Sequence, residues 1–310
     1  MLREPTVFIL GAGASHPYGF PSGQGLLQGA RVHDEETLRR ELRQLNRDSL
    51  QQIPAFRNAL ARTLEKSLDA MLEMRTDLSE VGKAFMARVL LECERSNRGR
   101  NLDPEGAWHR ELWTAISAKS LEEVSQCALT IVTFNYDRSV EYALIGALEA
   151  RFKRSRSECA EALASIGPIH LHGSLGVLPE FSTPGQASVL YGGDSQEVTP
   201  VNCLNAAAGI RIIHEAHPND EAFARARDAL STAKRVVFLG FGYANQNIER
   251  LQLQTCLNPA TQIYLCVTGF TPHQQLALVR PHFSGFRVVS MGEEKQDIVH
   301  FFRRFPEVLI

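Results

Sequence analysis

Short apolar runs recur along the chain, and each ends in glycine or polar residues. Runs of this length without alternation are typical of strands buried on both faces of a parallel sheet. They predict strands over residues 6–10, 128–134, 169–172, 209–214, 235–241, 262–267 and 286–290. Helical spacing between the runs predicts helices over 139–152, 220–233, 272–279 and 297–305, the third with Thr271 as N-cap and Pro272 as first residue. Strands that alternate with helices predict an α/β fold, a Rossmann-like doubly wound parallel sheet.

Between the first two predicted strands, the apolar residues recur at helical spacing, and the short apolar runs that predict strands are absent. Its apolar positions form three helical faces: Leu38, Leu42 and Leu45; Phe56, Leu60, Leu64, Leu68 and Leu72; and Phe85, Val89 and Cys93. The polar residues 95–103 predict an exposed loop. We therefore expect an inserted α-helical module over residues 26–125, and an α/β domain made of residues 1–25 and 126–310.

Composition narrows the class of protein. The 310 residues carry a formal net charge of -2, so no overall basic field favours direct binding of nucleic acid. The first residues lack a signal-peptide pattern, and no run approaches the roughly 20 apolar residues of a membrane helix, so we expect a soluble, cytoplasmic protein without a membrane partner. The six cysteines contain no Cys-x-x-Cys pair, which disfavours a zinc ribbon or a disulfide framework.

Gly11-Ala12-Gly13-Ala14-Ser15 directly follows the first predicted strand. Small residues there allow backbone N–H groups to approach a pyrophosphate closely, although a structural turn without a ligand has the same sequence. The loop departs from the Gly-x-Gly-x-x-Gly fingerprint of dehydrogenases, because position 16 is histidine. No acidic residue ends a clear second strand about 20 residues further on, so hydride transfer is disfavoured.

Polar residues follow three other predicted strands, at 133–137, 170–174 and 240–247. In open α/β sheets the carboxyl ends of the strands form the ligand crevice, so we expect these loops to converge with the glycine loop. Taken singly, each has a structural alternative. Asn135 and Asp137 are also suited to cap the next helix, and His172 to be a buried structural histidine.

In this combination the sequence resembles the sirtuin-like superfamily. The resemblance rests on the Gly-Ala-Gly-x-Ser loop at 11–15, a Gly-x-Pro step at 19–21, Thr-x-Asn-x-Asp at 133–137, a His-Gly pair at 172–173 and a glycine-led loop at 240–247. The motifs occur in the family's order and lie within the α/β domain, outside the insert. The resemblance implies that the chain takes NAD as its substrate.

Two features indicate a branch of that superfamily. Deacylase sirtuins carry a zinc module with two cysteine pairs and an acyl-lysine channel; this sequence has neither signature, and no zinc is expected. Asn135-Tyr136-Asp137 resembles instead the bacterial branch that cleaves NAD in antiphage defence. That branch implies a homo-oligomer and a defence partner such as a HerA-type ATPase or an Argonaute. The late loop departs from the family, with Tyr243-Ala244-Asn245 where Ser-x-x-Asp is common.

The resemblance also implies residue roles. His172 would be the general base, since an ordinary histidine pKa near ~6.5 suits proton transfer at neutral pH. Asn135 would orient the ribose and the attacking water, and Asp137 would position nicotinamide or the ribose, or hold Asn135. The pyrophosphate would lie on Gly11, Ala12, Gly13 and Ser15, with Pro21 and Thr133 completing the pocket, and the adenosine half on Gly240, Gly242, Asn245 and Asn247.

The predicted activity is that of an NAD glycohydrolase, which cleaves the nicotinamide–ribose bond to give nicotinamide and ADP-ribose. Its transition state would resemble the oxocarbenium ion of glycoside cleavage. Two alternatives stay open: a non-catalytic sensor of NAD or an NAD derivative that gates assembly with a partner, and a protein deacylase without zinc. The insert is expected to cover the pocket or to make oligomer contacts.

Overall fold

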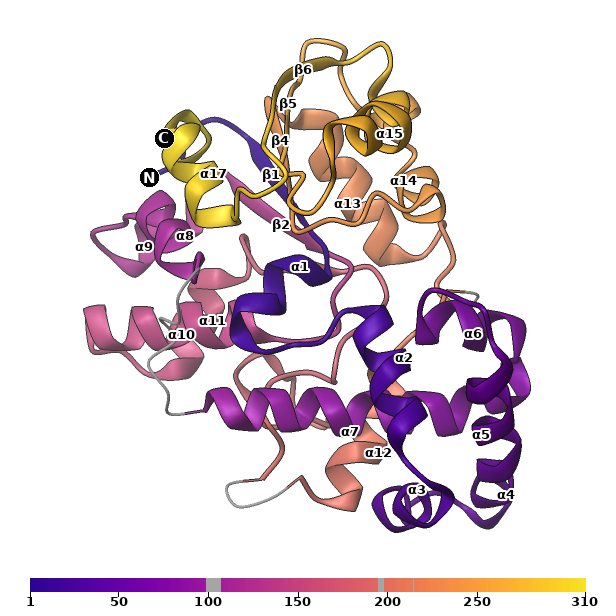
Figure 1. Ribbon diagram of the computed structural model, residues 1–310. Coiled ribbons are helices and arrows are strands. Elements are labelled where there is room, and N and C mark those ends of the chain that lie inside the picture. The colour runs from indigo at the N-terminus through magenta and orange to yellow at the C-terminus, as the bar shows by residue number, and fades with distance from the viewer. Residues whose placement is uncertain (99–106, 195–197, 214) are drawn as a thin grey trace.

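A computed structural model describes residues 1–98, 107–194, 198–213 and 215–310, and a six-stranded parallel sheet lies at its centre (Figure 1). Its strands lie in the order β3-β2-β1-β4-β5-β6, so the chain winds outward from β1 in both directions. This order is the doubly wound Rossmann arrangement and confirms the predicted fold class. The strands are β1 (Thr6–Leu10), β2 (Leu129–Thr133), β3 (Ile169–His170), β4 (Arg235–Leu239), β5 (Gln262–Leu265) and β6 (Arg287–Met291).

The central strand β1 sets where the functional loops begin. Its last residue, Leu10, is in register with Thr133 of β2 and Leu239 of β4, so three strands end at the same level. β1 is buried along its whole length, and its side chains alternate between the two faces of the sheet. Phe8 lies in the apolar core of one face and Ile9 in that of the other, as the uninterrupted apolar run predicts.

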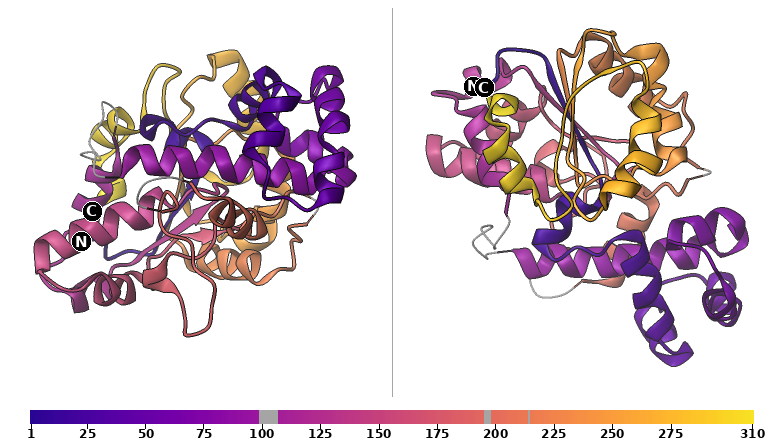
Figure 2. Two further views of the ribbon diagram at one scale, coloured as in Figure 1. Left: turned by 90° about the horizontal axis from the view of Figure 1, so that it is seen from below. Right: turned by 45° about the horizontal axis from the view of Figure 1, so that its top comes forward.

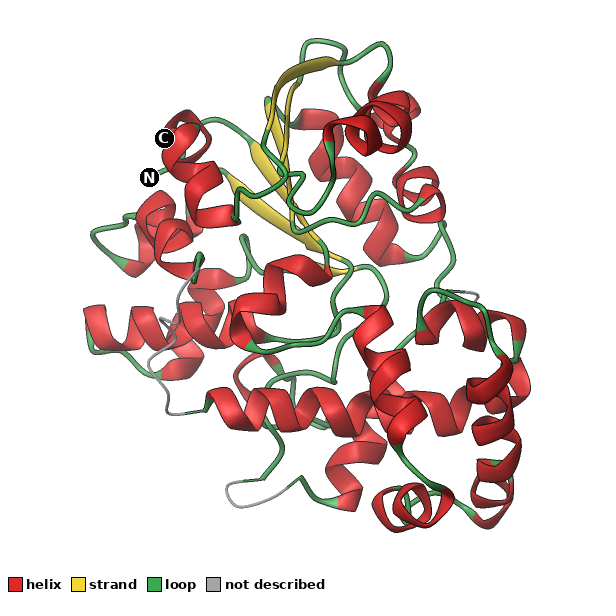
Figure 3. Cartoon of the chain, viewed as in Figure 1, coloured by secondary structure: helices red, strands yellow, loops and turns green. Residues whose placement is uncertain are grey.

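Helices cover both faces of the sheet, as Figures 2 and 3 show. One face carries α8 (His109–Ile116), α9 (Leu121–Ser125), α10 (Ser139–Phe152), α11 (Arg156–Leu163) and α17 (Ile298–Arg304). The other carries α13 (Glu221–Thr232), α14 (Asn245–Leu251) and α15 (Leu253–Cys256), whereas α16 (Pro272–Gln274) has no buried residue. The predicted helices 139–152, 220–233 and 297–305 are thus confirmed to within one residue at each end. Thr271 caps α16, which continues as one π-turn, Gln275–Val279.

After β1 and the short α1 (Ala12–Ser15), six helices form a module beyond the carboxyl ends of the strands (Figure 1). They are α2 (Gly23–Val32), α3 (Glu35–Glu41), α4 (Arg47–Gln51), α5 (Ile53–Arg62), α6 (Leu68–Met74) and α7 (Ser79–Asn97). From here on, the insert means α2–α7 alone, a narrower segment than the predicted residues 26–125. It packs through α7 on α12 (Pro200–Gly209), and its apolar core is continuous with that of one sheet face. The division into a helical module over residues 26–125 and an α/β domain stays a prediction. The helices α8 and α9, which lie inside that range, pack with α10 and α11 of the sheet domain.

The strand predicted over 209–214 is wrong. Thr199 caps a helix that Pro200 begins, and this helix, α12, continues to Gly209. After it, Ile210 forms only an isolated antiparallel bridge with Gly173. Gly209 contacts the backbone there so closely that a Cβ atom would lie 2.4 Å from the carbonyl oxygen of Ser174. Residue 214 lies outside the described residues.

The helical face predicted from Phe56 to Leu72 is divided between two helices. α5 ends at Arg62, and Ser67 caps α6 by accepting a hydrogen bond from the amide of Ala70 at 3.1 Å. Leu64, between them, is 98 % exposed rather than part of the face. The loop predicted over 95–103 begins later than expected because α7 runs to Asn97, and residues 99–103 lie outside the described residues. The break at 63–67 matters for function because it borders a cavity.

Candidate active site at the carboxyl edge of the sheet

A cavity of about 490 Å³ lies between the carboxyl edge of the sheet and the insert. This volume lies within the range of about 300–1,000 Å³ that small-molecule sites occupy. Four strand-end loops contribute to its lining, including Ala12, Ser15, Asn135, Asp137, His172, Gln246 and Asn247. The loops that the sequence predicts to converge thus meet at one cavity, at the position where ligands bind in doubly wound folds.

The insert supplies the opposite wall of the cavity. Residues 64–67 line it from the break between α5 and α6, and Asp69 and Ala70 line it from α6. Gly23 and Leu26 of α2 and Leu90 of α7 complete this side. Sequence reasoning did not identify these residues as part of a site, because amphipathic spacing identifies a helix but not what its polar face contacts. The expectation that the insert covers the pocket agrees with this wall.

The glycines of the first loop serve chain packing. A Cβ atom on Gly11 would lie 2.7 Å from the carbonyl oxygen of Gly240, and one on Gly240 only 2.0 Å from the amide nitrogen of Ala14. The amide of Gly11 donates to the carbonyl of Leu239 at 3.0 Å, and that of Gly13 to the carbonyl of Gly240 at 2.9 Å. These glycines therefore let the loops after β1 and β4 touch, and their amide groups already have backbone partners.

The other predicted binding residues divide between the cavity and its surroundings. Pro21 and Asn247 line the cavity, together with Gln246, which sequence reasoning missed. Asn245 is exposed at the first turn of α14, and Gly242 is exposed with open space around it. Thr133 is buried at the end of β2, where its hydroxyl accepts a hydrogen bond from the amide of Asn135 at 3.0 Å. Contact of these residues with a dinucleotide stays a prediction.

Three polar side chains form one chain of hydrogen bonds at the floor of the cavity. Nδ2 of Asn135 donates to the carbonyl oxygen of Gly11 at 3.0 Å and to Oγ of Ser15 at 2.9 Å. Oγ of Ser15 in turn donates to Oδ2 of Asp137 at 2.6 Å. Both N–H bonds of the Asn135 amide are thereby used, which leaves its carbonyl oxygen Oδ1 as the acceptor group.

Asp137 is buried and receives hydrogen bonds on both carboxylate oxygens. Besides Ser15 on Oδ2, the hydroxyl and the amide of Ser139 both donate to Oδ1, the amide at 3.2 Å. Burial raises the pKa of Asp137, and the hydrogen bonds from Ser139 and Ser15 oppose that rise. Asp137 therefore contacts Ser139 at the start of α10 and also supports Asn135 through Ser15, but the N-cap of α10 is Arg138 and the helix has no side-chain cap, so the capping role predicted as the alternative for Asn135 and Asp137 is wrong.

His172 lines the same cavity as this chain of hydrogen bonds and is 5 % exposed. Its ring contacts Phe134, with ring centroids 5.6 Å apart. Within the part of the chain that the structure describes, Nε2 of His172 is buried without a hydrogen-bond partner. Burial, aided by the positive charge of Arg250, lowers the pKa of His172 to about 4. The imidazole is therefore neutral at physiological pH, with a lower pKa than the ordinary value that the sequence suggested.

A second histidine, His170, supports the loop from behind. Its Nδ1 lies 2.8 Å from the carbonyl oxygen of Asn135, and its Nε2 lies 2.8 Å from Oε1 of Glu141. Burial lowers the pKa of His170, but the charge and hydrogen bond of Glu141, the hydrogen bond with Asn135 and the charge of Asp137 together outweigh it, so the net shift is upward. Two histidines two residues apart thus have opposite environments, and only their contacts distinguish them.

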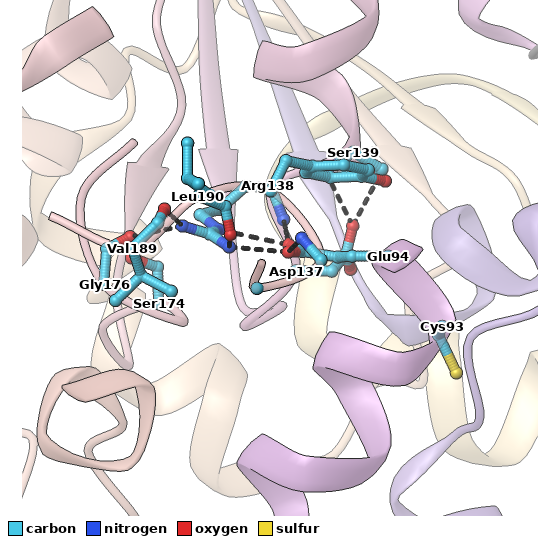
Figure 4. Close-up of polar contacts among 12 residues, drawn as sticks. Cys93, Glu94, Asp137, Arg138, Ser139, Ser174, Gly176, Val189 and Leu190 are labelled. Atoms are coloured by element: carbon cyan, nitrogen blue, oxygen red, sulfur yellow. Dashed lines mark hydrogen bonds and ion pairs between the residues drawn. The ribbon is translucent and has the colours of Figure 1, made fainter. Parts of the chain in front are cut away.

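The loop after β2 is also bound to the insert. Oη of Tyr136 donates to Oδ1 of Asp69 at 2.5 Å, and the Tyr136 side chain is buried. Figure 4 shows the neighbouring contact, in which the guanidinium of Arg138 meets the carboxylate of Glu94 from α7. Both members of that ion pair are at most 1 % exposed. Neither Asp69 nor Glu94 belongs to one of the sequence motifs quoted above.

Among the described residues, no cysteine lines the cavity. All six cysteines are free thiols, and Cys127, Cys159, Cys203 and Cys266 are buried. Within residues 1–98, 107–194, 198–213 and 215–310, no group of three or more His, Cys, Asp or Glu side chains is arranged to hold a metal ion. In the same ranges, no helix is both long enough and apolar enough to cross a membrane.

Chains similar to this one occur among solved structures. No protein-family model matches the chain, and no curated protein matches it. Eight chains of solved structures do match, among them one described as the crystal structure of a Sir2 homolog-NAD complex. That match has 14 % sequence identity, covers 98 % of this chain and 90 % of the other, and has a TM-score of 0.46. The geometry of the chain itself defines a doubly wound α/β protein with a cavity of small-molecule size at its carboxyl edge, where polar side chains of the strand-end loops meet.

Proposed function

We propose that this protein binds NAD in the cavity and hydrolyses the bond between nicotinamide and ribose, releasing nicotinamide and ADP-ribose. The observation that carries the proposal is the pairing of two groups in one cavity. Asn135 presents an oriented carbonyl oxygen, and His172 presents a buried neutral imidazole whose Nε2 has no partner among the described residues. Together they supply an acceptor that holds a hydroxyl or water and a group that takes a proton.

The reaction needs little assistance for departure of the leaving group. When the bond between C1′ and the nicotinamide nitrogen breaks, the electron pair goes to a cationic ring, which leaves as a neutral molecule. The remaining ribose has oxocarbenium character, as in glycoside cleavage. The oxygen of a water then bonds to C1′, and the proton that it loses passes to the protein. The protein must therefore position the ribose and water and accept one proton.

Asn135 and His172 fit these two tasks. Oδ1 of Asn135 would accept a hydrogen bond from the ribose or the attacking water, and Ser15 and Gly11 hold the amide in that orientation. His172, with a pKa of about 4, is a weak base, but it is almost entirely unprotonated at neutral pH. A water that has begun to bond to a cation becomes acidic, so a weak base suffices late in the step.

An acidic residue also borders the cavity. The positive charge of the nicotinamide ring, and then of the ribose, would develop near Asp137, whose pKa is raised by burial, although three hydrogen bonds oppose that rise. Asp137 would act mainly through Ser15, which it holds against Asn135. Of the residues predicted to contact the pyrophosphate, Ala12 borders the cavity, as does Ser15, whose hydroxyl is bonded instead to Asn135 and Asp137. Asn247 borders the cavity on the side assigned to adenosine.

The biological setting that we propose follows from the sequence resemblance. We place the activity in the cytoplasm, as depletion of NAD in antiphage defence, by a homo-oligomer that works with a partner protein such as a HerA-type ATPase. NAD is a substrate in this proposal, and no zinc takes part. The observations on the cavity support the chemistry, whereas the setting rests on the motifs alone.

One incubation distinguishes the proposed function from its alternatives. Purified protein is mixed with NAD, with and without an extract of phage-infected cells, and nicotinamide and ADP-ribose are quantified by chromatography. Equimolar formation of both products supports hydrolysis. Binding of NAD by calorimetry, with no nicotinamide released in either condition, would instead establish a sensor. Nicotinamide release that depends on an acetyl-lysine peptide would establish a deacylase.

A further inference from the structure

Four consecutive residues after β2 contact two different parts of the molecule in alternation. We call residues 135–138 the site strip. Asn135 and Asp137 bond to Ser15, in the first loop of the sheet domain. Tyr136 and Arg138 bond instead to the insert, each to one acidic side chain. The contacts of the two polar residues of the site thus alternate along the chain with those of their two anchors.

The first anchor joins the strip to α6. Tyr136 is buried, and its hydroxyl donates to Oδ1 of Asp69 at 2.5 Å, with the carbonyl oxygen of Arg211 further away at 3.4 Å. Burial raises the pKa of Asp69, and the hydrogen bond from Tyr136 opposes the rise. Asp69 also borders the cavity, so this hydrogen bond joins the insert to the site strip directly beside the cavity.

The second anchor joins the strip to α7, as Figure 4 shows. Nη2 of Arg138 donates to Oε2 of Glu94 at 2.6 Å, and Nε donates to Oε1 at 3.1 Å. The amide of Arg138 donates to the same Oε1 at 3.1 Å, so Glu94 binds the backbone of the strip as well as the side chain. Nη1 of Arg138 donates to the carbonyl of Val189 at 2.5 Å.

We propose that Asp69 is a positioning residue, which holds Asn135 in its working orientation through Tyr136 and thereby makes the insert part of the active-site support. This inference rests on the proposed function. The Asn135 amide must reach Gly11 and Ser15 together, at 3.0 and 2.9 Å. Hydrogen bonds weaken steeply beyond such distances, so a small displacement of Tyr136 breaks the pair of contacts next to it. A misplacement of ~1 Å can lower a rate by about 100-fold.

Steady-state kinetics on Asp69 variants test the inference. Asp69→Ala removes the acceptor for Tyr136, and kcat should fall about 10- to 100-fold with little change in KM. Asp69→Asn keeps an acceptor oxygen of the same reach and should restore most of kcat. Tyr136→Phe should lower kcat similarly, and adding it to Asp69→Ala should cause little further loss, because both changes break one contact.

A matched control removes a different contact between the insert and the rest of the protein. Nζ of Lys83 on α7 lies 3.1 and 3.0 Å from the two carboxylate oxygens of Glu215, outside the strip. Lys83→Ala should therefore keep wild-type kcat, even where its melting temperature falls as that of Asp69→Ala does. Equal loss of kcat in Lys83→Ala and Asp69→Ala would overturn the inference, because general loosening of the insert would then explain both.

Amide hydrogen exchange of residues 134–138 without NAD separates this inference from the proposed function. Asp69→Ala should exchange faster there than Lys83→Ala and Asp69→Asn. If the wild type releases no nicotinamide, the proposed function fails, while faster exchange in Asp69→Ala still supports positioning of the strip. Wild-type exchange and wild-type kcat in Asp69→Ala would overturn the positioning role, whatever the substrate.

Discussion

Oγ of Ser15 accepts a hydrogen bond from Nδ2 of Asn135 at 2.9 Å and donates one to Asp137 at 2.6 Å. Ser15 thus connects an amide to a carboxylate within the protein, although its place in the glycine loop suggests a phosphate ligand. The two roles differ in their kinetic consequences. A residue that orients Asn135 acts on the chemical step, whereas a phosphate ligand acts mainly on substrate binding.

We predict that Ser15→Ala lowers kcat for NAD by about tenfold or more and leaves KM nearly unchanged, because Asn135 loses one of two groups that fix its amide. Initial rates of nicotinamide release over a range of NAD concentrations give both constants. A rise in KM at unchanged kcat would show that Ser15 binds the pyrophosphate and does not position Asn135.

The pH dependence of the reaction should reflect the buried state of His172. The proposed base works only when neutral, so kcat/KM should stay level from neutral pH downward and fall as the pH passes through about 4. The same lowered pKa makes folding less favourable in acid: this stability is complete above the ordinary value of 6.5 and is lost progressively as the pH falls toward about 4.

Circular dichroism at each pH therefore has to accompany the rate measurements, so that unfolding is not read as protonation of the site. A decline of kcat/KM centred near the ordinary histidine value of 6.5, in protein that stays folded, would contradict the environment described for His172.

Packing of the two glycine loops predicts a difference between two neighbouring glycines. Gly240 has a φ of 56°, and a Cβ atom there would lie 2.0 Å from the Ala14 amide nitrogen. Gly240→Ala should therefore lower the free energy of unfolding by about 2 kcal/mol or more. Gly242 has open space around it, so Gly242→Ala is the matched control and should change that free energy by less than about 0.5 kcal/mol.

Urea denaturation followed by circular dichroism measures both variants. Equal stability of Gly240→Ala and the wild type would mean that the loops after β1 and β4 do not touch as described. Loss of NAD binding in a stable Gly240→Ala variant would favour a direct ligand contact for this loop.

The parts of the fold that the sequence predicts are those set by local pattern. Unbroken apolar runs identify β1 and β4, and helical spacing places α10 at its observed bounds. Convergence of the strand-end loops follows from parallel pairing alone, since all strands of such a sheet point the same way. Asn135, Asp137 and His172 could therefore be brought to one cavity from the sequence.

The rest depends on tertiary contacts that no local pattern records. A glycine that allows a phosphate to approach closely cannot be distinguished in the sequence from one that allows another loop to approach. The residue that Gly11 contacts, Gly240, lies more than 200 residues further along the chain. The apolar run at 209–214 is typical of a strand, but Thr199 caps a helix, α12, that continues to Gly209 at the start of this run. The role proposed for Asp69 depends on the packing of α6 beside Tyr136.

The central claim is that Asn135 and His172 carry out hydrolysis of NAD. The most direct test is the rate of nicotinamide release by Asn135→Ala and His172→Ala, with the exposed His273→Ala as control and a thermal melt of each variant as a check of folding. We predict that each of the two site variants, while still folded, loses about 100-fold or more of the wild-type rate and that His273→Ala retains it. Consumption of NAD at the wild-type rate by folded Asn135→Ala or His172→Ala would contradict the account.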